Sequence, residues 1–159
     1  LKVGDPRDEA TSIGPVIDEA SAKRIDGWID EAIRGGAKAL VRGKRAGNLL
    51  GASLLRDVPR GANLYRREAF GPVACIEAFD DFEQAIARVN DSDFGLQAGV
   101  FTASIEHAMR AWDRIEAGGV VVAPGQQRGA GRGAAQLRAG AYVAGGSFSS
   151  EGGAGRPNR

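Results

Sequence analysis

The chain has 159 residues, a formal net charge of +1 and a single cysteine. This length is enough for one domain with a core, and 43% apolar and 26% charged residues are ordinary values for a soluble globular protein. The near-neutral charge gives no general attraction to nucleic acid or anionic membranes. A lone cysteine excludes a disulfide framework or a Cys-rich zinc site, and no stretch approaches the roughly 20 apolar residues of a membrane span. We therefore expect a cytoplasmic protein that does not enter a membrane.

The first third of the sequence predicts a loop, a helix and two strands. The chain begins with Leu1 in LKVGDP, which is typical of a strand end entering a turn, so we expect the polypeptide or its ancestor to extend upstream. Apolar residues recur at spacings of three and four over residues 18–34, which predicts an amphipathic helix that ends at a pair of glycines. Short apolar runs then predict strands over 38–42 and 52–57.

The stretch from Glu68 to Pro72, within REAFGPVACIEAF, is the most informative local motif. It places a carboxylate, an aromatic ring and a Gly-Pro turn directly before an apolar run. The ring and the turn restrict the backbone, so the direction of the carboxylate is fixed. Residues 73–79 follow as a strand whose apolar residues do not alternate with polar ones, which predicts burial on both faces.

Strands and helices alternate after this motif. Asp81 is the predicted N-cap of a helix, with Gln84 as its capping-box partner, and 97–102 is the next strand. Ser104 is the predicted N-cap of a second helix, and 120–122 is the third strand. The apolar faces of the two helices comprise Phe82, Ala85, Ile86 and Val89, and Ile105, Ala108, Met109, Trp112 and Ile115. This order predicts a parallel βαβαβ arrangement with right-handed crossovers, in an α/β fold whose parallel sheet is flanked by helices.

The composition changes after residue 122. Residues 123–159 are dominated by Gly, Ala, Arg and Ser, and no period of 2 or 3.6 residues is sustained there. Such a segment cannot bury enough apolar area to offset the entropy lost on ordering. We therefore divide the chain into a folded part, 1–122, and a tail, 123–159, that is disordered or loosely attached.

Four segments of the folded part resemble the aldehyde dehydrogenase superfamily, in the C-terminal part of its catalytic domain. They are LKVGDPRDEATSIGPVIDEASAKRI, REAFGPV, FDDFEQAIARVNDSDFGLQAGVFT and RIEAGGVVV, in the order and with the spacing of the family. The resemblance implies oxidation of an aldehyde to a carboxylic acid, with NAD or NADP as cofactor. It also implies that Glu68 binds the hydroxyls of the nicotinamide-side ribose and that Phe70 lies beside the nicotinamide.

The departures from the family bear on activity. The family's nucleophilic cysteine and general-base glutamate lie upstream of the matching segments, so we assign no catalytic residue in this chain and expect no turnover from it alone. Ala123 stands where the family has an asparagine. A segment rich in Arg, Gly and Ala that starts abruptly in mid-fold is what a GC-rich gene gives when read in a shifted frame, and this is our hypothesis for 123–159.

Several residues have a structural interpretation beside the chemical one. Cys75 lies in mid-strand without a neighbouring His or Lys to lower its thiol pKa, so we predict a small buried hydrophobe rather than a nucleophile. Glu68, taken alone, would suit a surface ion pair with Arg66 and Arg67. His107 is the only histidine and is assigned to the helix surface. The acidic residues that suit helix starts and turns, and for which we expect no metal site, are Asp80, Asp81, Asp91 and Asp93.

Two other functions stay open beside the enzymatic one. The first is a non-enzymatic association module, a homo-oligomer held by exposed apolar surface. The second is RNA binding through the tail, but its five arginines lack interleaved aromatic residues, so nucleic acid is not the partner we favour. Gly129-x-Gly131-x-x-Ala134 matches a loose dinucleotide fingerprint. It does not directly follow a strand or open a clear helix, so we assign it no cofactor.

Overall fold

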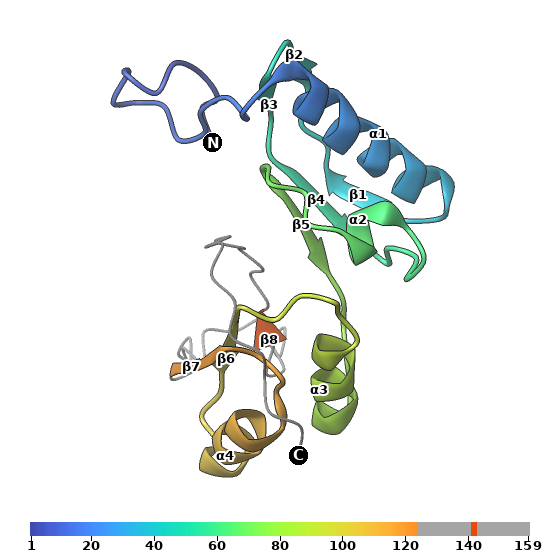
Figure 1. Cartoon of the computed structure of the whole chain (residues 1–159), viewed down its shortest axis with the longest axis vertical. Helices are drawn as coiled ribbons and strands as arrows, with labels where there is room; N and C mark the ends of the chain where they lie inside the picture. Colours follow the sequence, from blue (N-terminus) through green and yellow to red (C-terminus); the bar gives the residue numbers. More distant parts are fainter. Residues whose placement is uncertain (124–140, 143–159) are drawn as a thin grey trace, which may run out of the picture.

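The computed structural model describes residues 1–123 and 141–142 of the chain. Two groups of elements follow each other, and each has its own hydrophobic core (Figure 1). The first region runs from helix α1 to strand β5, and the second from helix α3 to strand β7. Both regions contain helices and strands, which confirms the predicted α/β class.

Helix α1 spans Glu19–Arg34, as predicted. The Asp18 side chain caps its start by accepting a hydrogen bond of 2.6 Å from the Ser21 amide, and Gly35 caps its end. The stripe of apolar residues at spacings of three and four is buried, and its buried members are Ala22, Ile25, Ile29 and Ala32. The cap and the stripe together explain why this segment is a helix and which face it turns to the core.

The first region contains a three-stranded sheet in the order β1-β4-β5. Strands β1 (Lys38–Val41) and β4 (Ser53–Arg56) are antiparallel and lie where strands were predicted. Strand β5 (Val73–Ile76) runs parallel to β4, with Ser53 opposite Val73. Because β4 pairs with β5, the motif before β5 is held at the edge of this sheet.

A small hairpin that the sequence did not predict connects β1 to β4. Its strands β2 (Arg45–Ala46) and β3 (Leu49–Leu50) are antiparallel. The chain crosses itself closely at its base, because a Cβ added to Gly43 would lie 2.0 Å from the carbonyl oxygen of Gly51. Only glycine allows this approach, which brings Leu50 into the core.

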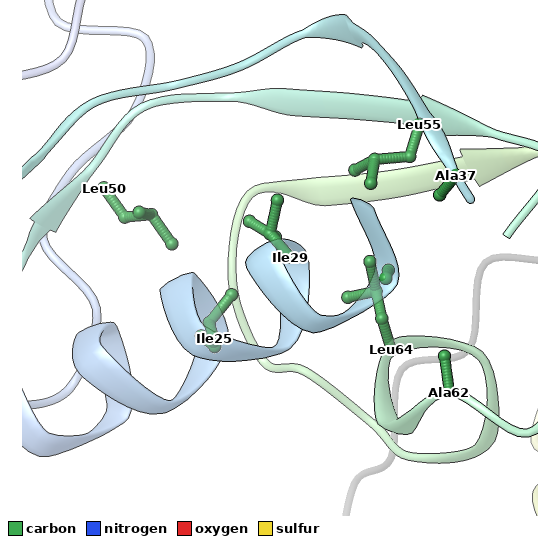
Figure 2. Packing of buried hydrophobic residues seen from close by; sticks show 8 residues of the cluster. Ile25, Ile29, Ala37, Leu50, Leu55, Ala62 and Leu64 are labelled. Atoms are coloured by element: carbon green, nitrogen blue, oxygen red, sulfur yellow. The ribbon is translucent and has the colours of Figure 1, made fainter. Parts of the chain in front are cut away.

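The core of the first region lies between α1, the hairpin and the sheet. Figure 2 shows Ile25 and Ile29 of α1 on the side of the helix that faces Leu50 and Leu55, and all four side chains are completely buried. A short helix, α2 (Asn63–Arg66), adds Leu64 to this core. Burying such aliphatic side chains contributes about 1.5–3 kcal/mol each.

The second region contains two longer helices and one parallel pair of strands. Helix α3 (Phe82–Asn90) is capped by Asp81, and helix α4 (Ile105–Arg114) by Ser104, both as predicted. Gln84 does not complete a capping box, because it accepts a hydrogen bond of 2.7 Å from Arg88. Strand β6 (Gln97–Phe101) runs parallel to β7 (Gly119–Ala123).

The predicted βαβαβ arrangement is wrong at its first step. Strand β5 belongs to the sheet with β1 and β4, whereas β6 belongs to a second sheet in the order β7-β6-β8. The prediction for β5 is also wrong in detail, because the strand ends at Ile76 and is only partly buried. Within the described residues β5 is an edge strand, which leaves one side of it without a neighbour and explains the exposure.

The apolar face that was predicted to be buried on helix α4 is buried only in part. Ala111 and Ile115 pack into the core of the second region, whereas Ile105, Met109 and Trp112 are exposed by 78%, 57% and 68%. Spacing alone assigned all but Ala111 to one buried side. The spacing of apolar residues therefore did not predict that part of this face is exposed.

The predicted tail lies mostly outside the described residues. Within it, Ala141–Tyr142 forms strand β8, which pairs antiparallel with β6, although no regular structure was expected there. The Gly129-x-Gly131-x-x-Ala134 pattern and the arginines considered for RNA binding lie outside the described residues.

Candidate functional site

The motif from Glu68 to Pro72 connects α2 to β5. Glu68 is half-buried, whereas the Phe70 side chain is 62% exposed. Phe70 has a φ of 53°, a left-handed conformation that is unusual for an aromatic residue. The motif therefore holds a carboxylate next to an outward-facing ring on a strained backbone.

Both ends of this motif are held by the first region. The Ser53 amide of β4 donates a hydrogen bond of 2.9 Å to the carbonyl oxygen of Pro72. The Arg67 amide donates one of 2.9 Å to the carbonyl oxygen of Asn63, at the end of α2. In the middle, Arg24 of α1 donates a hydrogen bond of 3.2 Å to the carbonyl oxygen of Ala69.

The approach of α1 to the motif explains the glycine of the Gly-Pro turn. A Cβ on Gly71 would lie 2.7 Å from the Cδ1 atom of Ile25, a residue that is completely buried. A side chain at this position would push the turn away from α1. The close contact between the Gly71 backbone and α1 thus restricts the conformation of the motif. This agrees with the restricted backbone that the sequence predicted.

The ion pair considered for Glu68 is not formed. Arg66 binds Asp91 at 3.1 Å, and Arg67 donates a hydrogen bond of 3.2 Å to the side chain of Asn63. Across residues 1–123 and 141–142, no hydrogen bond or ion pair involves the Glu68 carboxylate. A half-buried carboxylate without a protein partner is able to accept hydrogen bonds from two neighbouring hydroxyls of a ligand.

Comparison with known proteins identifies the family. A model of the aldehyde dehydrogenase family matches residues 1–133, which is most of the chain. The chain belongs to the aldehyde dehydrogenase family. The match extends past the predicted boundary at residue 122 and includes the beginning of the 123–159 segment.

Individual aldehyde dehydrogenases agree with this assignment. The 3-sulfolactaldehyde dehydrogenase of Priestia aryabhattai is 43% identical over 122 residues, which cover 77% of this chain and 26% of that protein. The structure of aldehyde dehydrogenase 21 from Physcomitrella patens, in complex with the reaction product succinate, is 39% identical with a TM-score of 0.75, over 77% of this chain and 25% of that one.

A third relative carries a cofactor. The NADP-dependent glyceraldehyde-3-phosphate dehydrogenase from Bacillus halodurans, complexed with NADP, is 42% identical with a TM-score of 0.72, over 81% of this chain and 27% of that one. The chain thus spans about a quarter of the length of the aldehyde dehydrogenases that it matches. The resemblance inferred from sequence motifs is confirmed.

Cys75 is not the buried residue that the sequence predicted, because it is exposed in the edge strand β5. It lines a cleft of about 280 Å³ between α2, β5 and α3, together with Tyr65 and Phe79. Although the residue as a whole is exposed, partial burial among these side chains raises the pKa of the Cys75 thiol. The thiol is therefore protonated at neutral pH, which disfavours nucleophilic attack.

None of the residues that line the cleft comes from the Glu68–Pro72 motif. Burial also raises the pKa of the Tyr65 hydroxyl on the cleft wall, and the charge of Glu77 adds to this effect. The carboxylate of Glu77 is paired with Arg88 at 3.0 Å. Asp91, also on the wall, is paired with Arg66, so these two charges of the cleft are already neutralised.

The remaining predicted site residues have structural contacts. His107 is half-buried rather than on the surface, and its ring stacks on Phe82 with 4.2 Å between the ring centroids. Asp81 caps α3 and Asp91 ends it, as their helix-boundary roles require. In the described parts of the chain, no three His, Cys, Asp or Glu residues come together in a way that could hold a metal ion. Nor does any described helix combine the length and apolar character needed to cross a membrane.

Sequence reasoning missed Arg24, which contacts the motif, and Trp28, on which Arg24 stacks. The Arg24 guanidinium lies 4.4 Å from the centroid of the Trp28 ring, one helical turn away on α1. The spacing of four residues was visible in the sequence and is typical of a side-chain pair on one helix face. The contact between Arg24 and Ala69, 45 residues apart, was not.

Proposed function

We propose that this chain provides the nicotinamide-ribose contact of an NAD(P)-dependent aldehyde dehydrogenase catalytic domain. Glu68 accepts hydrogen bonds from the ribose hydroxyls, and Phe70 forms an apolar wall beside the nicotinamide. The cofactor, NAD or NADP, supplies the hydride acceptor for aldehyde oxidation. The observation that carries this proposal is the half-buried Glu68 carboxylate, which has no partner among the described residues and lies two positions before the exposed ring of Phe70.

The cofactor site of the chain is tested by titrating the 15N-labelled full chain with NAD⁺ and NADP⁺ and following amide signals by NMR. A single ribose contact supplies about 1–3 kcal/mol, so we expect a dissociation constant in the millimolar range or weaker. The shifts should centre on residues 68–72, and Glu68→Gln should weaken them because an amide replaces one carboxylate acceptor by a donor. Glu9→Gln, at an exposed glutamate of the N-terminal loop, is the matched control. Shifts that avoid 68–72, or that survive in Glu68→Gln, would rule out this ribose contact.

We further propose that this chain alone does not oxidise aldehydes. Its single cysteine has a raised thiol pKa, and no carboxylate has been assigned as its general base. Formation of NADH from propanal and NAD⁺ should therefore stay at background. Aldehyde-dependent turnover that is abolished by Cys75→Ala would contradict this proposal, whereas turnover that persists in the variant would indicate a contaminant. The names of the relatives refer to different aldehydes, so the substrate class is an aldehyde in general.

The exposed face of α4 favours self-association as a second function. Ile105, Met109 and Trp112 present a contiguous apolar strip along one side of this helix. We propose that two copies of the chain bury this strip against each other. Trp112→Gln should then shift the chain from dimer to monomer in sedimentation velocity. Lys23→Gln, at an exposed position on α1, should not. A monomeric wild-type chain at 100 µM, the concentration at which an interface of about 5.5 kcal/mol half-assembles, would exclude this function.

A further inference from the structure

The backbone of Phe70 is strained, and the Phe70 side chain does not hold it. A φ of 53° is rarely adopted by residues other than glycine, asparagine and aspartate, because the Cβ atom crowds the carbonyl group. Such conformations persist only where the surroundings hold them. The ring itself is 62% exposed and therefore has little packing that could do so. The restraint must come from the residues on either side of Phe70.

Helix α1 contacts the motif on both sides of Phe70. Before it, the carbonyl oxygen of Ala69 accepts the hydrogen bond of 3.2 Å from Arg24. After it, Gly71 packs so closely on Ile25 that a Cβ would lie 2.7 Å from the isoleucine Cδ1 atom. Arg24 and Ile25 are consecutive residues. One turn of one helix therefore fixes the peptide groups that flank the strained residue.

The Arg24 side chain is itself held in place. Its guanidinium lies over the Trp28 ring at 4.4 Å, and Trp28 packs against the core of the first region. Stacking of a guanidinium on an aromatic face restricts the rotation of the guanidinium. Its N–H groups remain free to donate hydrogen bonds in the plane of the guanidinium. Among residues 1–123 and 141–142, Arg24 takes part in no ion pair. Its hydrogen bond goes to the motif instead of to an acidic neighbour.

We infer that Arg24, stacked on Trp28, is a positioning residue that holds Glu68 and Phe70 in the conformation that binds the nicotinamide-side ribose. This inference rests on the proposed function. Arg24 acts through the Ala69 carbonyl group, which belongs to the residue between the carboxylate and the ring. Loss of its hydrogen bond releases Phe70 toward an ordinary negative φ. Gly71 and Pro72 are held in place, so a change of φ at Phe70 rotates the residues before it. The Glu68 side chain then points in a different direction.

The inference is tested in the full chain with Arg24→Met, which keeps the apolar stem and removes the donor. Two signals are measured by NMR: the Phe70 one-bond coupling between the α carbon and the α proton, which differs between positive and negative φ, and the affinity for nicotinamide mononucleotide. We expect a changed Phe70 coupling and an affinity about tenfold lower, equivalent to about 1.4 kcal/mol. Arg24→Lys should recover part of both, because its ammonium donates to Ala69 but stacks less well on Trp28. Lys23→Met, at the exposed neighbouring position, should change neither.

An unchanged Phe70 coupling in folded Arg24→Met overturns the inference, even if affinity falls, since Arg24 would then contact the ligand directly. Should the Met variant fail to fold, Arg24→Lys takes its place, and a wild-type coupling with wild-type affinity in that variant overturns the inference. If the wild-type chain does not bind the mononucleotide, the proposed function fails. The Phe70 coupling of Arg24→Met still shows separately whether Arg24 positions the motif.

Discussion

The two regions of the chain bury their apolar residues to different degrees. In the first region, the core contains four large aliphatic side chains that are completely buried. In the second region, the buried residues include two alanines, and Val100 is the largest side chain that is fully covered. The second region also exposes the apolar face of α4 and parts of β7. The first region is therefore the better packed of the two.

This difference bears on where the Glu68–Pro72 motif lies. All of the contacts described for residues 69–72 come from the first region: from Arg24 and Ile25 on α1 and from Ser53 on β4. A strained backbone needs rigid surroundings, and fully buried side chains provide them. The second region, with its exposed apolar surface, is suited to packing against another surface. The chain thus combines a rigid support for the motif with a region that remains partly uncovered.

The largest effect should come from opening the core of the first region. Ile29→Ala removes a completely buried side chain and should lower the free energy of unfolding by about 2–5 kcal/mol. Val100→Ala, in the second region, removes two carbon atoms and should cost about 2 kcal/mol. Both values are obtained from urea denaturation followed by circular dichroism.

Hydrogen exchange in the same two variants tests whether the regions are separate. Ile29→Ala should reduce protection in α1 and β4 more than in β6, and Val100→Ala should do the reverse. Equal loss of protection in both regions for either variant would show that the two cores unfold as one cooperative unit. The contrast drawn between them would then apply to packing but not to stability.

A smaller effect should come from the ion pairs that connect α1 to the segment after β1. Arg42 binds Asp26 at 2.5 Å and Asp30 at 2.9 Å, and the Arg42 and Asp26 side chains are about one quarter exposed. Arg42→Met leaves the Asp26 carboxylate with only the longer contact to Arg45, at 3.4 Å. We expect a loss of about 1–2 kcal/mol in the free energy of unfolding.

The matched control for this prediction is Arg110→Met in the second region. Arg110 binds Glu83 at 2.9 Å, but its side chain is 49% exposed. Exposed pairs contribute little because water screens them, so the urea midpoint should not change. A loss in Arg110→Met as large as in Arg42→Met would show that the second region depends on its surface charges to the same extent.

The sequence predicted those elements whose ends and faces carry their own signals. Helix α1 was found from its apolar residues at helical spacing and the glycine pair that ends it. Helices α3 and α4 were found because Asp81 and Ser104 are strong N-caps followed by the same spacing. Helix α2 was missed because its N-cap, Ala62, offers no side-chain hydrogen bond. The strands of the β2–β3 hairpin have two residues each, too few for a period to be visible.

What the sequence could not give depends on tertiary contacts. The sheet to which β5 belongs is decided by its pairing with β4, which no local pattern encodes. The same holds for the buried face of α4, since both of its faces are apolar. Glu68 and Phe70 were named from a family motif, whereas Arg24 was missed because its partner, Ala69, contributes only a backbone carbonyl group.

The smallest effect concerns pH and contrasts helix α1 with helix α4. The hydrogen bond from the Ser21 amide holds the pKa of Asp18 below its ordinary value of about 4. A carboxyl group with a lowered pKa in the folded state adds stability above its unfolded pKa, and this stability is lost as the pH falls through the folded value. The first turn of α1 should therefore lose hydrogen-exchange protection below about pH 4. Helix α4 should not lose protection for this reason, because its cap is the Ser104 hydroxyl, which does not titrate.

Asp18→Asn isolates this titration, because asparagine is also a good N-cap but carries no charge. At pH 6 the variant should lose a little protection at Ser21, since a neutral acceptor replaces a charged one. Between pH 5 and pH 3 the protection in wild type should fall toward that of the variant, whose own protection stays level. Parallel pH profiles for the two chains would mean that Asp18 does not set the acid sensitivity of α1. The carboxyl groups of Asp5, Asp8 and Asp57, whose pKa values are also lowered by hydrogen bonds, would then be the ones to substitute next.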